Sequence, residues 1–506
     1  MISLPTVFIA GLLLATTVTT APQSPPEGGL EKLEASVIEH QLENGWTFLI
    51  VPRAGVPVVS FHTYIDVGGI FEDPGATGMA HMFEHMAFKG SRRLGSKDWS
   101  LEKRALSDVD KAYAGLEAVR LAGSAGAISQ AEARFTSAQD RAARLVQPEA
   151  FSKLLEEAGG SGSLNASTSA EETNYVVSLP SNRLELWCWL ERERFADPVL
   201  REFYKERDAV LEERRMRVES DPFGALIEQL LGTAFTKHPY RRPVIGYAED
   251  LTRFSRTQAE EFYAKNYGVR RFTTAIVGDV DPKTLVPMLE SYFGDFEPGP
   301  EPTTVDIVEP TQEAERRVEV EFPAMPIVIA AWHIPGKSHA DTTSLEIGLS
   351  ILGQAQASRL NESLIRNRGL GAEIGSFSGL PGDRYPNLAV VYGIPAPGVP
   401  IESLEAGIFE VMTKLQADGP TDEELAGAKT RARANLLRGL ASNEDLAASL
   451  CEWKSKSGDW HNLFRQTEVV AAVTAKDIQR VFAKYFTKDN RTIATLVPLQ
   501  ETTGGL

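Results

Sequence analysis

The sequence has few cysteines and fewer basic than acidic residues. Only two of its 506 residues are cysteines, Cys188 and Cys451, and their separation fits no metal-ligand spacing, so we expect both in the core. Basic residues are also in deficit: 52 Lys and Arg against 69 Asp and Glu give a formal net charge of −17. This argues against nucleic acid as the main partner, because phosphate binding needs a basic surface. An acidic surface would steer cationic substrates, although keeping the protein soluble is the simpler explanation.

Long apolar runs are also scarce. The clearest is V-F-I-A-G-L-L-L-A-T-T-V at 7–18, which small residues and a Pro-rich stretch follow. It has the length of a signal-peptide core and is too short to span a bilayer well. No Lys or Arg precedes it, so a disordered or interfacial tail is the alternative. We interpret residues 1–24 as a signal peptide and expect an exported protein, periplasmic or secreted, without stable membrane insertion.

The chain contains an internal duplication. Residues 254–278 align without a gap with 473–497, at an offset of 219. Four identities relate the two segments: Ala264, Lys265, Thr273 and Ala275 recur as Ala483, Lys484, Thr492 and Ala494. In both copies a helical pattern ends near an aromatic pair, and a β-rich run follows. A weaker match of 180–185 with 400–405 has nearly the same offset, which favours two homologous modules.

The Pro/Glu-rich stretch 297–311 cannot hold a regular helix and is predicted to link modules at 35–296 and 312–500. Strand patterns alternate. Within 56–67, one set of residues is apolar (Val59, Phe61, Ile65, Val67) and the intervening set is polar (Ser60, His62, Asp66). Alternation indicates a sheet with one covered face. We therefore predict an α+β fold in which each module is a mainly antiparallel sheet covered by helices.

Residues 96–158 interrupt the first module. They are rich in Ala, Glu, Arg and Leu, have a helical pattern, and are broken by Ala-Gly-Ser-Ala-Gly at 122–126. We interpret this segment as an inserted helical hairpin that projects from the module.

The strongest chemical signal lies in G-M-A-H-M-F-E-H-M-A-F-K-G-S at 78–91. His81 and His85 are one helical turn apart on one face, and Glu84 lies close to that face. Two neutral imidazoles at this spacing suit Zn²⁺, which still needs a third protein ligand and an open position for water. The order H-x-x-E-H reverses the better-known H-E-x-x-H and is a zinc-enzyme signature in its own right. Ordinary helix residues are the alternative, but only eight histidines occur in the chain, which makes a chance match improbable.

A third ligand should be acidic. The segment 202–222 has a strong helical pattern in which Glu206 and Glu213, seven residues apart, share a face while Glu212 points elsewhere. Composition alone favours a solvated charged helix here.

A family resemblance decides between these interpretations. H-M-F-E-H at 81–85 together with E-R-D-A-V-L-E-E at 206–213 resembles the pitrilysin family of zinc peptidases, which includes insulysin and mitochondrial processing peptidase. Three further segments are similar to the family, at 162–180, 238–246 and 276–282, so the resemblance covers nearly the whole chain beyond residue 35.

The resemblance implies a zinc endopeptidase with one Zn²⁺ per chain, held by His81, His85 and Glu213. Glu84 would be the catalytic base, and Glu206 would support the site from beside it. Asn165 and Ala166 resemble edge-strand residues against which the family lays an extended peptide substrate. The distance along the chain from His85 to Glu213 exceeds the family's usual spacing, and the insertion accounts for the excess.

The second module lacks these groups. No H-x-x-E-H follows residue 300, and Glu206 and Glu213 correspond to Ala428 and Asn435. The family's substrate-binding Arg and Tyr are only half present: Arg368 matches, but the tyrosine position holds Ala372, with Tyr385 and Tyr392 as nearby alternatives. We therefore expect a heterodimer whose partner, a chain of the same fold, supplies the Arg/Tyr pair and helps to enclose a peptide or unfolded protein. A non-proteolytic peptide-binding or scaffold subunit is the alternative.

Overall fold

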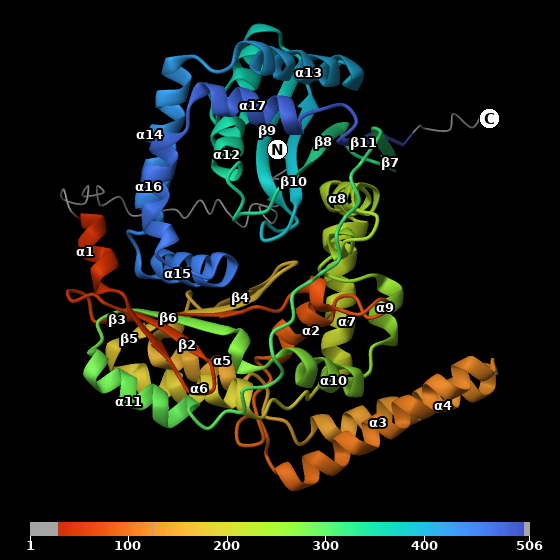
Figure 1. The fold of residues 1–506 in the computed structure, drawn as a ribbon. Helices are drawn as coiled ribbons and strands as arrows, with labels where there is room; N and C mark the ends of the chain where they lie inside the picture. Colours follow the sequence, from red (N-terminus) through yellow and green to blue (C-terminus); the bar gives the residue numbers. More distant parts are fainter. Residues whose placement is uncertain (1–28, 124, 500–506) are drawn as a thin grey trace.

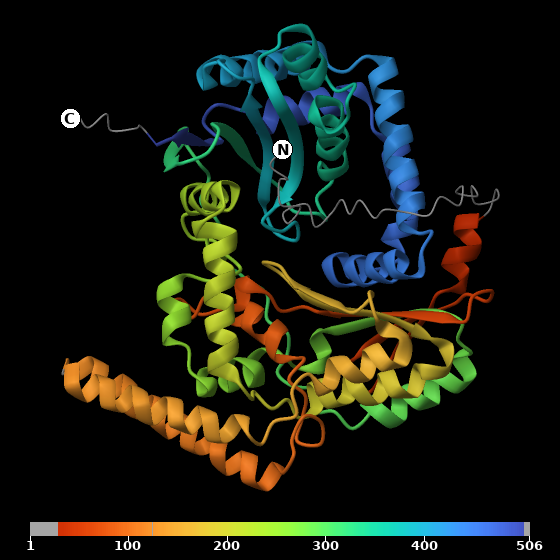
Figure 2. The same ribbon diagram turned by 180° about the vertical axis from the view of Figure 1, so that it is seen from behind.

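The computed structural model describes residues 29–123 and 125–499, which form two lobes, each built on one β-sheet (Figures 1 and 2). The predicted signal peptide at 1–24 lies outside the described residues. Within them, no helix combines the length and apolar character that a membrane span requires. Both cysteines are buried, as predicted.

The two sheets share one strand order, apart from an additional edge strand, β1, in the first. The first runs in the order β1 (Ile38–Gln41), β2 (Thr47–Pro52), β6 (Phe272–Gly278), β3 (Val58–Ile65), β5 (Thr173–Pro180), β4 (Asn165–Thr168). The second runs β7 (Arg316–Phe322), β11 (Arg491–Pro498), β8 (Ile327–Ile334), β10 (Asn387–Pro395), β9 (Gly371–Leu380). Each contains one parallel pair, β2 with β6 and β7 with β11, and every other pair is antiparallel. The predicted α+β class with mainly antiparallel sheets is confirmed.

The repeated sequence segments occupy equivalent places in the two sheets. Helix α10 (Arg256–Asn266) leads into β6, and α17 (Ala475–Tyr485) leads into β11, with both helix boundaries at the offset of the sequence match. Both helices begin with a capping box, from Ser255 and from Thr474, whose side chains accept a hydrogen bond from the third helical residue. The local signals that start these helices are therefore duplicated along with the fold.

Helices cover both faces of the first sheet. On one face, α6 (Leu184–Ala196) and α11 (Pro282–Phe293) pack an aromatic core in which Phe61 stacks on Trp187 and Trp46 contacts Phe293. On the other face lies α15 (Asn443–Ser457), which belongs to the second half of the chain. Ser60 and His62 are consequently buried. The expectation of a sheet with one covered face is wrong here, because a helix that follows nearly 400 residues later covers the polar-patterned side.

The first half covers the second sheet in return. Helix α8 (Pro222–Ala234) lays Leu226 and Leu230 on one face of that sheet, against Val390 and Leu496. The other face packs against α12 (Thr342–Leu349), α13 (Ile401–Asp418) and α17. Each half thus supplies one helix to the other half's sheet, and the two lobes share their cores.

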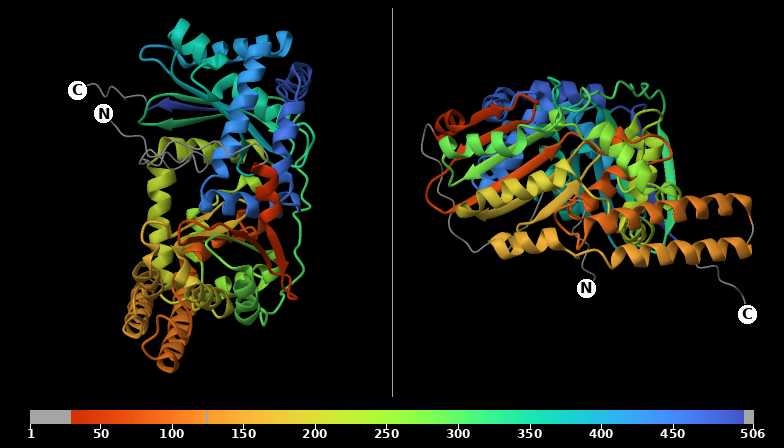
Figure 3. Two further views of the ribbon diagram at one scale, coloured as in Figure 1. Left: turned by 90° about the vertical axis from the view of Figure 1, so that its left-hand side faces the viewer. Right: turned by 90° about the horizontal axis from the view of Figure 1, so that it is seen from below.

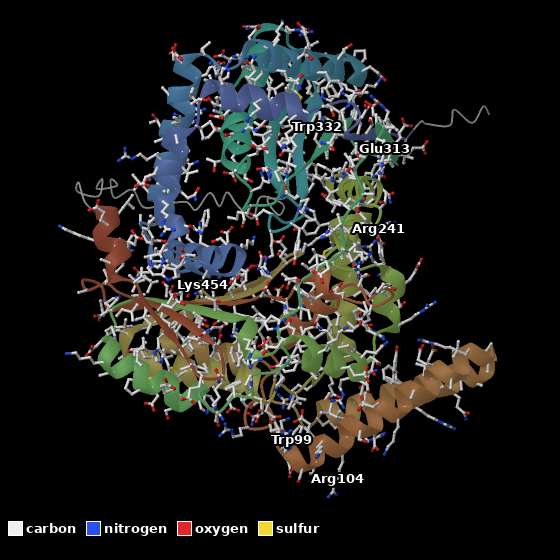
Figure 4. The ribbon with its side chains drawn as sticks, viewed as in Figure 1. Trp99, Arg104, Arg241, Glu313, Trp332 and Lys454 are labelled. Atoms are coloured by element: carbon white, nitrogen blue, oxygen red, sulfur yellow. The ribbon has the colours of Figure 1, made fainter. Side chains whose placement is uncertain are left out.

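The insertion forms an antiparallel pair of helices, α3 (Trp99–Ala122) and α4 (Ala125–Ala143), that projects from the first lobe (Figure 3). Trp99 and Arg104 mark its base in Figure 4. The base is tied to the body: Arg201 Nε donates to Glu102 Oε1 at 2.8 Å, and both side chains are almost fully buried. Arg256 Nε likewise donates to Asp110 at 2.9 Å. Among the described residues of the hairpin, those of the distal part form no such ion pair with the body.

The remaining helices are α1 (Gly29–Ser36), α2 (Met79–Met86), α5 (Ala150–Leu155), α7 (Phe203–Arg214), α9 (Ala248–Arg253), α14 (Asp422–Gly439) and α16 (Asn462–Ala472). Short 3₁₀ segments lie at Gly69–Phe71, Ser181–Arg183, Pro239–Arg241 and Val269–Arg271, and π-helical turns at Glu156–Gly160, Arg215–Glu219, Ser350–Gln354 and Asn361–Asn367.

Candidate metal centre

Helix α2 carries the H-x-x-E-H motif and is anchored at its N-terminus by a buried carboxylate. Glu72 accepts hydrogen bonds from Gly78 N at 2.9 Å and Ala80 N at 2.8 Å, which satisfies backbone donors that a helix start leaves free. Gly78 adopts a left-handed conformation with φ 96°, where an L side chain would be strained. Four apolar side chains of α2 enter the core of the first lobe: Met79, Met82, Phe83 and Met86. Helix α2 is therefore fixed at its start and along its apolar side.

Three donor atoms from α2 and α7 converge. Glu213 Oε2 lies 3.5 Å from His85 Nε2 and 3.7 Å from His81 Nε2. One ligand atom from each of these three residues lies within 4.8 Å of the other two. The two imidazole rings stand nearly perpendicular, with centroids 4.9 Å apart. The structure thus brings together all three residues that the resemblance implied as ligands.

This donor set fits Zn²⁺. Zinc holds His nitrogen and carboxylate oxygen at about 2.0–2.2 Å, so tetrahedral donors lie roughly 3.3–3.6 Å apart. The separations around Glu213 Oε2 are close to that spacing. Two imidazoles and one carboxylate are also the protein ligands of catalytic zinc sites that keep a fourth position open.

Glu206 lies behind the metal-facing side of His85. Its Oε2 is 3.6 Å from His85 Nδ1, and its other oxygen pairs with Lys89 Nζ. A carboxylate on the second ring nitrogen fixes the orientation of a ligand histidine. The position of Glu206 matches the supporting role that the resemblance implied.

Glu84 is held by a residue of the edge strand. Thr168 Oγ1 donates to Glu84 Oε2 at 2.7 Å, from β4 at the end of the first sheet. Asn165 and Ala166 lie on the same strand, the first exposed and the second half-buried. Thr168 lies within the family-like segment 162–180, but no sequence pattern assigns it a role, because its contact with Glu84 joins residues 84 positions apart.

The two histidines differ in their electrostatics. Burial lowers the pKa of His81 to about 4, which leaves its imidazole neutral at neutral pH. Burial acts the same way on His85, but hydrogen bonds with Glu206 and Glu213 outweigh it and raise its pKa to about 9. His85 is therefore protonated before a metal binds, and metal binding must release that proton.

The three carboxylates also differ. Burial opposes ionisation of Glu206, yet His85 and Lys89 lower its pKa to about 2. The pKa of Glu213 is likewise lowered against burial, by its hydrogen bond with His85 and by the charges around it. Burial raises the pKa of Glu84, which makes it the strongest proton acceptor of the three.

The second half offers no equivalent group at the matched positions. Both lie on α14: Ala428 is buried in the core and Asn435 is exposed. Arg368 forms a surface pair with Glu410 at 2.9 Å, and Ala372 is exposed on β9.

The two alternative tyrosines make contacts elsewhere. Tyr385 Oη accepts a hydrogen bond from Val305 N, and Tyr392 Oη donates to Glu373. In the part of the chain that the structure describes, neither hydroxyl forms a hydrogen bond with a residue of the metal centre.

Two family models match this chain. The one described as Insulinase (Peptidase family M16) matches residues 49–113 and 143–247, and the one described as Peptidase M16 inactive domain matches residues 253–432. The chain belongs to the insulinase, or M16, peptidase family. The resemblance to pitrilysin-type peptidases is confirmed. The interval between the two matched parts, 114–142, covers the end of α3 and nearly all of α4.

Similar proteins extend over most of the chain. Zinc protease PqqE of Helicobacter pylori is 24% identical over 464 residues, which cover 90% of this chain and 92% of that protein. An uncharacterised zinc protease of Mycobacterium leprae is 27% identical over 336 residues, covering 63% of this chain and 72% of that protein.

Solved structures share the fold. The crystal structure of a protease from Helicobacter pylori has a TM-score of 0.76 at 23% identity and covers 91% of this chain and 99% of that one. The periplasmic protease PqqL from Escherichia coli has a TM-score of 0.67 at 15% identity and covers 91% of this chain but 47% of that one.

Proposed function

We propose that this M16 peptidase-family chain is a zinc-dependent endopeptidase that cleaves extended or unfolded peptides. The observation that carries the proposal is the convergence of His81, His85 and Glu213, with Glu84 beside them on the same helix. In this proposal the three donors hold one Zn²⁺ per chain. When bound, zinc lowers the pKa of water and polarises the carbonyl of the scissile bond.

Three residues around the metal would have separate roles in catalysis. Glu84 removes a proton from the attacking water and passes it to the leaving amine. Thr168 binds Glu84 Oε2, which leaves Oε1 free to receive the proton. Glu206 fixes the His85 ring, and its own negative charge is compensated by Lys89.

The edge strand β4 supplies a place for the substrate backbone. Among the described residues β4 pairs only with β5, so its second edge is open to an extended peptide. We assign Asn165 and Ala166 to that contact, in which main-chain hydrogen bonds add the peptide to the sheet as a further strand.

We further propose that the active assembly contains a second chain of the same fold. The second half presents Ala372 where the family has a tyrosine, and the hydroxyls of Tyr385 and Tyr392 are engaged elsewhere. This chain matches only 47% of PqqL, and a structure described as the first half of PqqL is matched over 92% of its length. A partner subunit that brings an Arg/Tyr pair would complete a chamber around the peptide.

Export belongs to the proposal as well. It rests on the apolar run at 7–18 and on the likeness to PqqL, which is described as a periplasmic protease. We assign the protein to the periplasm or to secretion.

The test is zinc content together with cleavage of an unstructured peptide by the purified protein, with and without a partner chain that lacks H-x-x-E-H. Glu84→Gln should retain zinc and lose activity by about 10²–10⁴-fold, because it removes the base and spares the ligands. Cleavage by the Gln variant at nearly the wild-type rate would refute the role of Glu84. Full turnover by the isolated chain would refute the need for a partner. A wild-type protein that binds peptide, but that neither binds zinc nor cleaves the peptide, would instead be a scaffold subunit.

A further inference from the structure

The turn between β4 and β5 is buried where the two halves meet. It spans Ser169–Glu172, and the Ser169 hydroxyl accepts hydrogen bonds from the backbone N–H groups of Glu171 at 3.0 Å and Glu172 at 3.2 Å. Gly69 N and Ile70 N donate to the carbonyls of Ser169 and Ala170. The Glu171 side chain is completely buried. This turn is therefore part of the interior of the molecule, although it ends an edge strand.

Two elements of the second half hold Glu171. Arg384 N, in the turn between β9 and β10, donates to Glu171 Oε1 at 2.9 Å, and Lys456 Nζ on α15 lies 3.3 Å from Oε2. The approach is close: a Cβ on Gly382 would lie 2.6 Å from the Glu171 carboxylate. The first half adds one more donor, the Tyr240 hydroxyl.

Lys456 stays charged in this buried position. Its ammonium also lies 2.7 Å from Asp383, 3.7 Å from Glu172 and 3.8 Å from Glu452. Burial alone would lower the pKa of Lys456, but the surrounding carboxylates hold it well above its usual range. Removing one member of such a buried cluster leaves an uncompensated charge, so replacing Lys456 should disturb the Glu171 carboxylate with which it forms an ion pair.

The turn Ser169–Glu172 directly follows the residue that contacts the proposed base, Glu84. Thr168 precedes it, pairs with Thr173 across the hairpin, and donates to Glu84 Oε2. We propose that the metal-free half orients Glu84: Lys456 fixes Glu171, and the β4–β5 turn thereby holds Thr168 against the base. Glu171 and Lys456 are positioning residues in this scheme, which rests on the proposed function and gives the second half a part in it.

The experiment uses the tagged full-length chain, expressed in its own host and purified with any subunit that accompanies it. Lys456→Gln should lower kcat by about ten- to a hundredfold, since small displacements of reacting groups have effects of that size. Zinc affinity should stay within about twofold, because the three ligands lie on α2 and α7. KM should change less than kcat, because Asn165 and Ala166 lie at the end of β4 that is farther from the turn. Thr168→Val should reproduce the loss. The Lys456→Gln/Thr168→Val double variant should be no slower than Thr168→Val alone, since both act on one path.

The matched control lies two residues away. Lys454, also on α15 (Figure 4), pairs with Glu39 of β1, so Lys454→Gln breaks a contact between the halves without touching the turn. Its kcat should stay at the wild-type level. If Lys456→Gln fails to fold, Glu171→Gln/Lys456→Gln removes one charge of each sign and should show the same loss of kcat.

Two results would overturn the inference. The first is a wild-type kcat in a folded, zinc-loaded Lys456→Gln variant. The second is a loss of kcat in the Lys456→Gln/Thr168→Val double variant that equals the product of the losses in the two single variants. A wild-type protein without zinc or cleavage would instead refute the proposed function. Wild-type activity that Glu84→Gln abolishes but Lys456→Gln leaves intact would refute the positioning role alone.

Discussion

Two glutamates on α7 lie beside His85 but approach different nitrogens of its ring. Glu213 Oε2 lies between the Nε2 atoms of His81 and His85, whereas Glu206 reaches only His85 Nδ1. Each has its own cation, Arg217 for Glu213 and Lys89 for Glu206. The first glutamate is thus placed to bind the metal, and the second to orient a ring.

Substituting the two glutamates should separate these roles. Glu213→Gln removes a charged ligand and should abolish stoichiometric zinc binding. Glu206→Gln should weaken zinc affinity by about 10–100-fold, the usual effect of losing a partner of a ligand histidine. Competition with a chromophoric chelator measures both. Equal zinc retention in the two variants would void the assignment.

Arg217 is predicted to fix the ligand oxygen of Glu213. Its Nη1 lies 2.7 Å from Glu213 Oε1, so Oε2 alone faces the imidazoles. We expect Arg217→Gln to reduce zinc affinity by about tenfold or more. The matched control is Arg215→Gln, because Arg215 pairs with Glu212 on the exposed side of the same helix. Unchanged or tighter zinc binding in the Arg217 variant would show that its charge opposes the metal more than its contact helps.

The sequence predicts these residues unequally. Helical periodicity alone places His81 beside His85 and Glu206 on the same face as Glu213, and i, i+4 spacing could also have revealed Arg217. It could not reveal Lys89, which lies beyond the end of α2 and pairs with Glu206. The contact of Thr168 with Glu84 and the Glu72 cap on α2 depend on tertiary packing or on a loop, for which no spacing rule exists.

At the scale of elements, the inserted hairpin has two parts. Its base contains Glu102, which neutralises the buried Arg201, and Asp110, which pairs with Arg256. The distal part lies within 114–142, where the family model has no match. The base is integrated into the first lobe, and only the distal part is an appendage.

Two truncations should therefore differ. Replacing 117–132 by a short loop should leave zinc affinity unchanged and thermal stability nearly so, because surface insertions are well tolerated. Removing all of 96–158 leaves Arg201 buried without its carboxylate, which costs about 3–5 kcal/mol. Thermal unfolding and zinc content of both variants provide the measurement, with Glu102→Gln as the point control. Equal stability of the two truncations would contradict this division.

At the same scale, strand alternation and the repeat predicted two mainly antiparallel sheets, which the structure contains. They could not predict what covers the outer face of each. The alternating polar residues of β3 suggested solvent, but α15 lies over them, and the apolar faces of α8 and α15 give no sign of which sheet they contact.

At the scale of the whole molecule, the exchange of α8 and α15 makes the halves interdependent. Without α15 the first sheet would expose five apolar side chains: Leu49, Val51, Tyr64, Ala275 and Val277. Residues 29–296 produced alone should aggregate or bind a hydrophobic dye, whereas co-expression with residues 297–506 as a separate chain should restore a soluble complex with zinc. A monomeric, cooperatively unfolding first half would contradict this expectation.

The same exchange sets the order in which the protein can mature. A ribosome adding about 5–20 residues per second completes the first sheet at Gly278 roughly 10–30 s before it delivers the helix that begins at Asn443. Throughout that interval α15 is not available to cover the outer face of the first sheet, so the nascent first half cannot complete its folding. Under the export proposed above, this delay would keep the polypeptide unfolded until synthesis is nearly complete, when a secretion channel can still thread it.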